Sequence, residues 1–307
     1  MRQSNFVGVY GHTALDVIYN SDKFPSPNTT VELKSRQELF GGTGANLVRI
    51  ASTLGVPTAL ASHVGSDFPQ DFMDALKKSG VDTTDVVKVR GQRTPFVIMI
   101  SDSEHNQIGF VDQAAVLEQD RLPIRTHTAD SSKFVHIGTG RPSYMLKVAK
   151  RAKGRKKTVC FDPAQEIHYV YTPETLKAIM GYTDIFFCNS AELERAKSYL
   201  NLKEDVELLS YVNMIVNTRG GDGSRIITED DEIIVGTIKA DKVVDTTGAG
   251  DGYRAGFYAG LNKSLPFEEC AWVGAATASF IVESIGAQNK LPTWDMVQRR
   301  AARRKCV

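Results

Sequence analysis

The sequence predicts an α/β protein, a three-layer α/β/α sandwich around a mostly parallel central sheet, with a small β-sheet beside it. Three observations lead to this prediction. Short β-rich runs alternate with helical patterns along most of the chain, two further β-rich stretches lack intervening helices, and glycine-rich segments stand where strands give way to helices. The 307 residues, 42% hydrophobic and 24% charged, suit a single globular domain over residues 1–307.

The alternation begins near the N-terminus and resumes in the second third of the chain. Strand patterns separated by helical patterns predict right-handed crossovers, and therefore parallel strands with helices on both faces of the sheet. A hairpin and a long helical stretch, interrupted near Pro266, follow in the last third. The predicted strands are 6–10, 58–62, 134–137, 158–162, 185–188, 214–217, 225–228 and 232–235, and the predicted helices are 44–54, 68–78, 143–152, a stretch after residue 173, 191–200 and 249–284.

Two β-rich segments, about 19–39 and 93–111, do not fit the alternation. We interpret them as a small antiparallel sheet that stands off the main domain. One segment follows the first strand and the other interrupts the alternation, so they can meet as a lid over the carboxyl edge of the parallel sheet, where open α/β folds bind ligands. Two separate surface hairpins are the alternative interpretation.

The composition excludes several classes of protein. A net charge of +1 lacks the basic excess that nucleic-acid binding needs, so we expect no nucleic-acid partner. No apolar run is long enough to span a membrane, and the four cysteines lie far apart, as expected of a cytoplasmic protein. The six histidines show no metal-ligand spacing. The C-terminal basic run is interpreted as a solvated helix end: Arg299, Arg300, Arg303, Arg304 and Lys305.

The strongest motif is a glycine-rich segment at the start of an apolar helix, Asp245-Thr-Thr-Gly-Ala-Gly-Asp251. Consecutive amides at a helix start form a concave, partly positive site that suits an anion. An acidic residue in such a site makes chemical sense if Asp251 accepts a proton from an attacking hydroxyl group. The amides of Gly248, Ala249 and Gly250 then stabilise charge on a transferring phosphoryl group. A capped helix after a tight turn is the structural alternative.

This segment resembles the second signature, D-T-x-G-x-G-D, of the PfkB or ribokinase family of carbohydrate and nucleoside kinases. The family's first signature is similar to Gly41-Gly-Thr-Gly-Ala-Asn46, and the resemblance extends from Gly11 to Ala287. It implies a ribokinase-like fold, ATP as co-substrate, Mg²⁺ as cofactor and Asp251 as the catalytic base. The P-loop and dinucleotide-binding motifs and the protein-kinase motifs do not occur in the sequence.

The resemblance also implies where an acceptor molecule binds. Asp16 corresponds to an aspartate that grips two vicinal sugar hydroxyls, and Gly42 and Asn46 lie beside the same sugar. An amide can both donate to and accept from hydroxyl groups. Ala14 stands where the ribokinase form has asparagine, which counts against free ribose as the main substrate. Without the other motifs, Gly-Gly before a helix and an aspartate after a strand are ordinary turn and loop residues.

Two further motifs are similar to the family's nucleotide site. Asn189 and Glu192 match its N-x-x-E pattern, which serves the magnesium and phosphate region largely through water, although a capping box gives the same spacing. The segment 218–223 matches T-x-G-x-x-G, for which a hairpin turn is the alternative. The ATP-binding residues implied by the resemblance are Asn189, Thr218, Gly220, Gly223, Gly248 and Gly250.

Two departures bear on the acceptor. Sugar-acid kinases of the family carry an arginine on the strand that here reads Asp162-Pro-Ala-Gln165, while Tyr253-Arg-Ala-Gly256 is similar to the nucleoside and adenosine kinases. We therefore expect phosphoryl transfer from MgATP to the 5′-hydroxyl of a ribonucleoside. Gln165 and Phe110 are the candidates for contact with the base. The alternatives are a kinase of ribose or of a phosphorylated sugar such as fructose 6-phosphate, and a nucleoside-binding protein without catalysis.

The resemblance leaves two further expectations. Asp245 and Thr247 are candidate ligands of a monovalent cation such as K⁺, and the ammonium group of Lys290 is a candidate replacement for that cation. The protein is expected to be a monomer or a homodimer formed through the lid edges.

Overall fold

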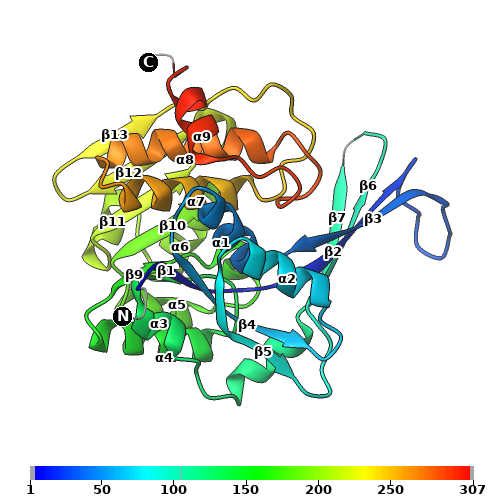
Figure 1. The fold of residues 1–307 in the computed structure, drawn as a ribbon, viewed down its shortest axis with the longest axis horizontal. Helices are drawn as coiled ribbons and strands as arrows, with labels where there is room; N and C mark the ends of the chain where they lie inside the picture. The colour runs from blue at the N-terminus through cyan, green and yellow to red at the C-terminus, as the bar shows by residue number, and fades with distance from the viewer. Residues whose placement is uncertain (1–3, 105, 305–307) are drawn as a thin grey trace.

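A nine-stranded sheet between two helical layers forms the main body of the molecule (Figure 1). The computed structural model describes residues 4–104 and 106–304. The strand order is β13-β12-β11-β10-β9-β8-β1-β4-β5. The bounds are β1 (Asn5–Tyr10), β4 (Thr58–Gly65), β5 (Asp82–Val89), β8 (Ser132–Ile137), β9 (Thr158–Phe161), β10 (Ile185–Asn189), β11 (Met214–Thr218), β12 (Ser224–Thr228) and β13 (Glu232–Val235).

All neighbouring strands from β11 to β5 pair in parallel, and β12 pairs antiparallel with both β11 and β13. This arrangement confirms the predicted mostly parallel sheet. The helices between the strands are α1 (Thr43–Thr53), α2 (Gln70–Lys78), α3 (His127–Ser131), α4 (Pro142–Gly154), α5 (Pro173–Met180) and α6 (Ser190–Leu200), and those after the hairpin are α7 (Ala249–Asn262), α8 (Phe267–Ile281) and α9 (Trp294–Ala301).

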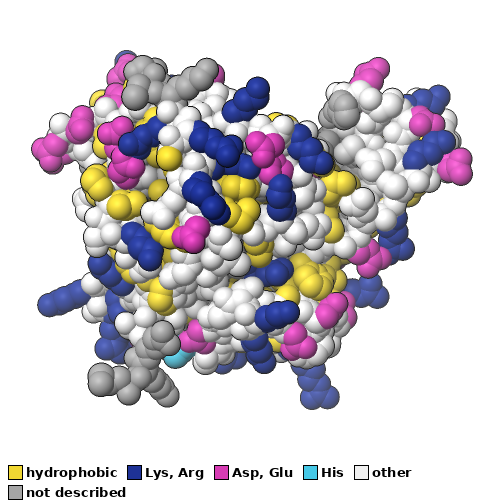
Figure 2. All heavy atoms as spheres, turned by 45° about the horizontal axis from the view of Figure 1, so that its top comes forward, with side chains coloured by type: hydrophobic (Ala, Val, Ile, Leu, Met, Phe, Trp, Pro, Cys, Tyr) yellow, Lys and Arg dark blue, Asp and Glu magenta, His cyan; other side chains and the backbone are white. Residues whose placement is uncertain are grey.

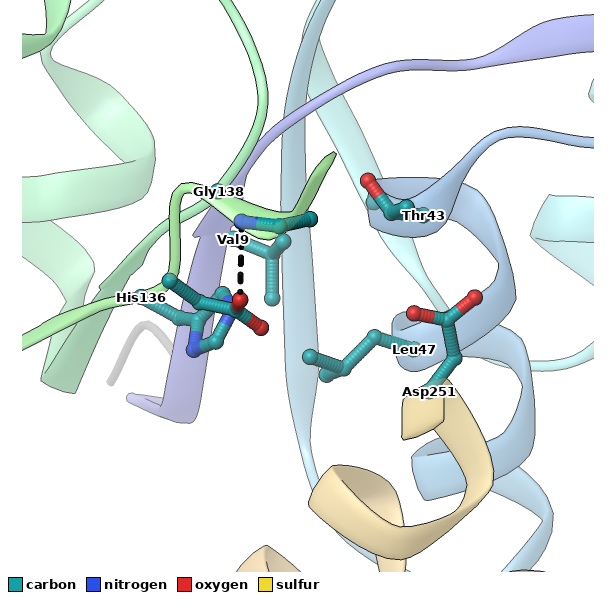
Figure 3. A pocket seen from close by; sticks show the side chains of 9 residues that line it. Val9, Thr43, Leu47, His136, Gly138 and Asp251 are labelled. Carbon is teal, nitrogen blue, oxygen red and sulfur yellow. Dashed lines mark hydrogen bonds and ion pairs between the residues drawn. The ribbon is translucent and has the colours of Figure 1, made fainter. Parts of the chain in front are cut away.

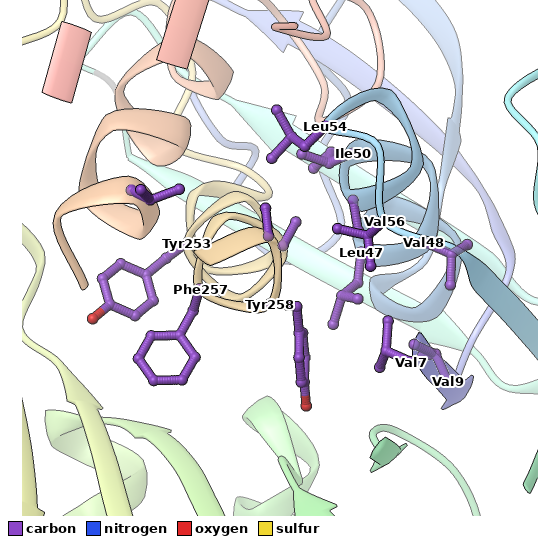
Figure 4. Packing of buried hydrophobic residues seen from close by; sticks show 14 of the residues in the cluster. Val7, Val9, Leu47, Val48, Ile50, Leu54, Val56, Tyr253, Phe257 and Tyr258 are labelled. Carbon is purple, nitrogen blue, oxygen red and sulfur yellow. The ribbon is translucent and has the colours of Figure 1, made fainter. Parts of the chain in front are cut away.

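Two hydrophobic cores, one on each face of the sheet, account for the three layers. Helices α1, α2, α7 and α8 share one core with alternate residues of the strands, and α3 to α6 share the other. Figure 4 shows α1 and α7 meeting over the sheet, with Leu47 facing Tyr258 and the β1 residues Val7 and Val9 below. This contact fixes the start of α7 relative to α1, and both helices carry predicted site residues.

A separate four-stranded sheet projects from one side of the body (Figures 1 and 2). Its order is β3-β2-β6-β7, with bounds β2 (Ala14–Ser21), β3 (Leu33–Gly41), β6 (Phe96–Ser101) and β7 (Gln107–Asp112). The predicted antiparallel pairing is wrong in one respect, because β2 and β6 pair in parallel. Each hairpin leaves the body through its first strand, so these first strands run in the same direction where they meet.

Two further features differ from the sequence prediction. Strand β5 was not predicted, because its apolar residues are diluted by Asp82, Thr83, Thr84 and Asp85. No strand precedes the glycine-rich segment, since residues 236–248 carry neither strand nor helix. Among the residues that the structure describes, none forms a helix both long and apolar enough to cross a bilayer.

Candidate functional site

The glycine-rich segment turns sharply into α7. Gly248 is the N-cap with φ 77° and ψ 3°, a left-handed conformation that favours glycine, and a Cβ here would overlap the side chain of Ala287. Asp245 holds the turn from below: its Oδ1 accepts the amide of Thr247 at 2.9 Å and its Oδ2 accepts the amide of Gly286 at 2.8 Å. The carboxylate of Asp245 therefore has a structural role in this loop.

The amides of the first turn of α7 have no carbonyl one turn earlier in the helix to bond with. Gly250 therefore offers a donor to an anion at the positive end of the helix dipole. The amide of Ala249 differs from it, because it donates to the carbonyl oxygen of Thr246 at 3.1 Å. The predicted anion site thus depends more on the two glycine amides than on that of Ala249.

Consecutive residues of α7 line two different cavities. Ala249 and Gly250 border a cavity of about 590 Å³, and Asp251 borders a small pocket between α1 and the carboxyl ends of β1, β8 and β9. Thr43 and Asp251 lie on one side of this pocket, and His136 and Gly138 lie on the other (Figure 3). The larger cavity is also lined by Thr218, Gly220, Gly221, Gly223, Tyr253, Ser279, Val282 and the irregular segment 237–243.

Asp251 is buried next to two charged side chains. Arg254 forms an ion pair with Asp162, to which its Nη2 donates at 2.9 Å, and its Nη1 lies 3.6 Å from Oδ1 of Asp251. Burial raises the pKa of Asp251 to about 6, although Arg254 and a hydrogen bond from Asn46 oppose this rise. Such a carboxylate is ionised at pH 7 and has more affinity for a proton than an exposed aspartate, as a general base requires.

The predicted acceptor residues Asp16, Gly42 and Asn46 meet around the same space as Asp251. Asn46 Nδ2 donates to Oδ2 of Asp251 at 2.8 Å. Asp16 lies on β2, and its buried Oδ1 has no hydrogen-bond partner among the described residues. Burial, followed by repulsion from Asp251 and Asp245, raises the pKa of Asp16 to about 7. An unpartnered, buried carboxylate oxygen is suited to accept a hydrogen bond from a ligand hydroxyl.

Neighbouring atoms lie so close to the backbone of the first signature that glycine is required at two of its positions. Gly42 has φ 88°, and a Cβ on it would lie 2.6 Å from the carbonyl oxygen of His12. A Cβ on Gly41 would overlap the carboxyl group of Asp16. Gly41 admits no larger residue while the carboxyl group of Asp16 stays where it is, and Gly42 admits none beside the backbone of His12 and Ala14.

Asn189 and Glu192 form the capping box at the start of α6. Asn189 Oδ1 accepts the amide of Glu192 at 2.9 Å, and Glu192 Oε2 accepts the amide of Asn189 at 2.7 Å. Among the described residues, no group of three or more His, Cys, Asp or Glu side chains could hold a metal ion. The donor set therefore fits a Mg²⁺ ion carried by nucleotide phosphates and reached through water, rather than an ion bound by the protein alone.

The two candidates for base contact are both exposed. Phe110 lies on β7 of the small sheet and is 58% exposed. Gln165 lies in the short 3₁₀ helix Ala164–His168 and is also exposed. Their contact with a base stays a prediction.

Several residues of the site were not predicted. Arg254 was used only as part of the Tyr-Arg-Ala-Gly motif, and its contact with Asp251 was not predicted. Its place three residues after Asp251 on a predicted helix indicates a shared helical face. The prediction that Arg300 lies in a solvated helix end is wrong, because Arg300 is 6% exposed and pairs with Glu283 at 2.7 Å and with Asp241, which lines the large cavity. Glu283 also accepts the amide of Asp241 at 2.9 Å, so α9 supports the cavity wall.

Known proteins resemble this chain over almost its whole length. The family model described as "pfkB family carbohydrate kinase" matches residues 4–294. A nucleoside kinase of Methanocaldococcus jannaschii is 41% identical over 292 residues, 94% of each chain, and one of Methanothermobacter thermautotrophicus is 36% identical over 95% of this chain and 94% of its own. The crystal structure of the M. jannaschii nucleoside kinase superimposes with a TM-score of 0.91 at 39% identity, covering 98% of this chain and 99% of the other.

Proposed function

Because the chain belongs to the pfkB family of carbohydrate kinases, we propose that it transfers the γ-phosphoryl group of MgATP to the 5′-hydroxyl of a ribonucleoside. The observation that carries this proposal is the position of two neighbouring residues. Gly250 lines the large cavity and Asp251 lines the pocket beyond it, so a phosphoryl group at the start of α7 lies between a nucleotide and an acceptor.

The nucleotide fits the larger cavity. Thr218, Gly220, Gly223 and Gly250 share its lining, and its volume of about 590 Å³ lies in the range of small-molecule sites. The amides of Gly248 and Gly250 face the γ-phosphate and stabilise the charge that develops on it. Asn189 and Glu192 would hold the magnesium of MgATP through water, and this ion would neutralise part of the phosphate charge.

The acceptor occupies the space among Asp16, Asn46 and Asp251. The unpartnered Oδ1 of Asp16 accepts a hydrogen bond from a ribose hydroxyl. This leaves the 5′-hydroxyl beside Asp251, whose carboxylate removes its proton as the new O–P bond forms and the bond from the γ-phosphorus to ADP breaks. Closure of the small sheet over this space excludes water and prevents wasteful hydrolysis of ATP.

ADP release from MgATP over a panel of acceptors tests the function. We expect turnover with adenosine, guanosine, inosine, cytidine or uridine, and at least about a hundredfold lower kcat/KM with ribose, fructose and fructose 6-phosphate. Asp16 is acidic, Asn46 is neutral, and Arg254 beside Asp251 is already paired with Asp162, so these residues offer no free cation to a phosphorylated sugar. Turnover confined to sugars or sugar phosphates would support kinase activity and rule out a nucleoside as the acceptor. No turnover with any acceptor would favour a binding protein without catalysis.

Asp245, one of the two residues expected to bind a monovalent cation, already has hydrogen-bond partners. Both carboxylate oxygens of Asp245 already accept amides, and the ammonium group of Lys290 pairs with the buried carboxylate of Glu283 in the adjoining segment. Burial alone would raise the pKa of Glu283, but Lys290, the amide of Asp241 and Arg300 outweigh it and hold this pKa at about 2. We therefore expect K⁺ titrated at fixed Na⁺ to change kcat by less than about twofold. Strong activation by K⁺ would contradict this assignment.

A further inference from the structure

A continuous line of polar side chains connects Arg49 to Asp251. Arg49 Nη1 donates to Oε1 of Gln288 at 2.6 Å, and Gln288 Nε2 donates to Oδ1 of Asn46 at 2.7 Å. Asn46 Nδ2 then donates to Oδ2 of Asp251 at 2.8 Å. Gln288 and Asn46 are 7% and 4% exposed, so water does not replace these partners freely.

The direction of every bond in this line follows from its first member. A guanidinium group has only donors, so the side chain of Gln288 must turn its oxygen to Arg49 and its nitrogen to Asn46. Asn46 must accept through its oxygen, which leaves its Nδ2 facing Asp251. A free asparagine amide could present either atom to a neighbour, but here the guanidinium group of Arg49 at one end of the line and the ionised carboxylate of Asp251 at the other select the same orientation.

We propose that Arg49 and Gln288 are positioning residues for the catalytic base: they fix the Asn46 amide so that it always donates to the carboxylate of Asp251. This inference rests on the proposed function, in which Asp251 acts as that base. A donor favours the ionised carboxylate and holds one of its oxygens, so that the other faces the acceptor hydroxyl. One N–H and one lone pair of the Asn46 amide remain for the substrate.

The charged groups around Asp251 make this donor important. Arg254 approaches from α7 itself, Asp162 from the end of β9 and Asp16 from β2. Burial and Asp162 favour the protonated form of Asp251, while Arg254 and the hydrogen bond from Asn46 favour the ionised form. If Asn46 turned its oxygen to Asp251, one of the two groups that keep the base ionised would become a repulsive neighbour.

The alternative is that Gln288 only attaches the segment after α8 to α1. The neighbouring Asn289 offers a control for this alternative, because its Nδ2 bonds to the carbonyl oxygen of Ile285 at 2.8 Å within the same segment, and its side chain is exposed. A residue with a purely structural role would alter stability, or kcat at every pH, without moving the titration of Asp251.

The test compares Gln288→Met with Asn289→Ala in the full-length protein. The methionine keeps the volume of glutamine and removes the donor, so we expect the acidic limb of the kcat–pH profile to move upward by about one unit. With a base that titrates near pH 6, this shift lowers kcat about fivefold at pH 6 and by less than about twofold at pH 8. Asn289→Ala should leave the limb in place. Arg49→Met should reproduce the shift. Arg49→Lys retains a donor, so its acidic limb should lie close to that of the unmodified protein.

Direct titration of the carboxyl group by ¹³C NMR, with the Asp251 signal identified from Asp251→Asn, gives the same comparison without turnover. A raised pKa of Asp251 in Gln288→Met supports the positioning role of Arg49 and Gln288 even if nucleosides prove not to be the acceptor. An unmoved carboxyl titration, or a loss of kcat of equal size at pH 6 and pH 8, overturns it. If Gln288→Met does not fold, Arg49→Met decides by the same criterion.

Discussion

Replacing Asp251 with asparagine is expected to lower kcat by roughly two to four orders of magnitude and to leave the KM for ATP within about twofold. Asparagine has the same shape as aspartate and can still accept the hydrogen bond from Asn46, so the site remains assembled. Its amide cannot take the proton of the acceptor hydroxyl. The measurement is steady-state ADP release at saturating nucleoside.

Asp71→Asn is the matched control, because Asp71 also lies in the first turn of a helix but is exposed and far from the cavities. It should retain the kcat of the unmodified protein. The pH profile supplies a second check: since burial raises the pKa of Asp251 to about 6, kcat should rise with pH through about 6 and then level off as the base becomes ionised. A large rise in the KM for ATP with normal kcat in Asp251→Asn would assign Asp251 a binding role instead.

Replacing Arg254 with methionine is expected to lower the free energy of unfolding by about 3–5 kcal/mol, because it leaves the carboxylates of Asp162 and Asp251 buried without their shared cation. For a chain of this size the corresponding fall in Tm is on the order of 10 °C. Thermal unfolding at pH 7, followed by circular dichroism, measures the change.

Two comparisons make this prediction specific. Adding Asp162→Asn to Arg254→Met removes one of the uncompensated charges and should recover a large part of the loss. Arg151→Met removes a pair with Asp130 on the surface, and should lower Tm far less than Arg254→Met does. An Arg254→Met protein as stable as the unmodified one would show that the two aspartates are already protonated in the folded state.

Most of the site residues that the sequence predicted lie in short segments at the end of a strand or at the start of a helix, whereas Asp16 and Phe110 lie within strands. Gly248 and Asp251 act through the local geometry of one turn, and Thr218, Gly220 and Gly223 act through another. Alternating strand and helix patterns place such junctions along one edge of a parallel sheet, which is why separate motifs converge without any knowledge of contacts.

The residues that sequence reasoning missed act over long separations. Gln288 contacts Asn46 across 242 positions of the chain, and no local pattern distinguishes it from any exposed glutamine. Arg300 resembled a solvated cation because its neighbours are basic, yet it turns inward to Glu283. The parallel pairing of β2 with β6 likewise depends on how two hairpins meet in space, which neither strand's sequence records.

The central claim is that Asp251 activates the 5′-hydroxyl of a nucleoside, and its most direct test is ADP release with adenosine and with 5′-deoxyadenosine, alongside the rest of the acceptor panel. The two compounds share the base and the vicinal hydroxyls that Asp16 is proposed to hold. We predict turnover with the preferred nucleoside, a 5′-monophosphate as product, and none with its 5′-deoxy form. Equal ADP release with both, or turnover only with free or phosphorylated sugars, would contradict the account.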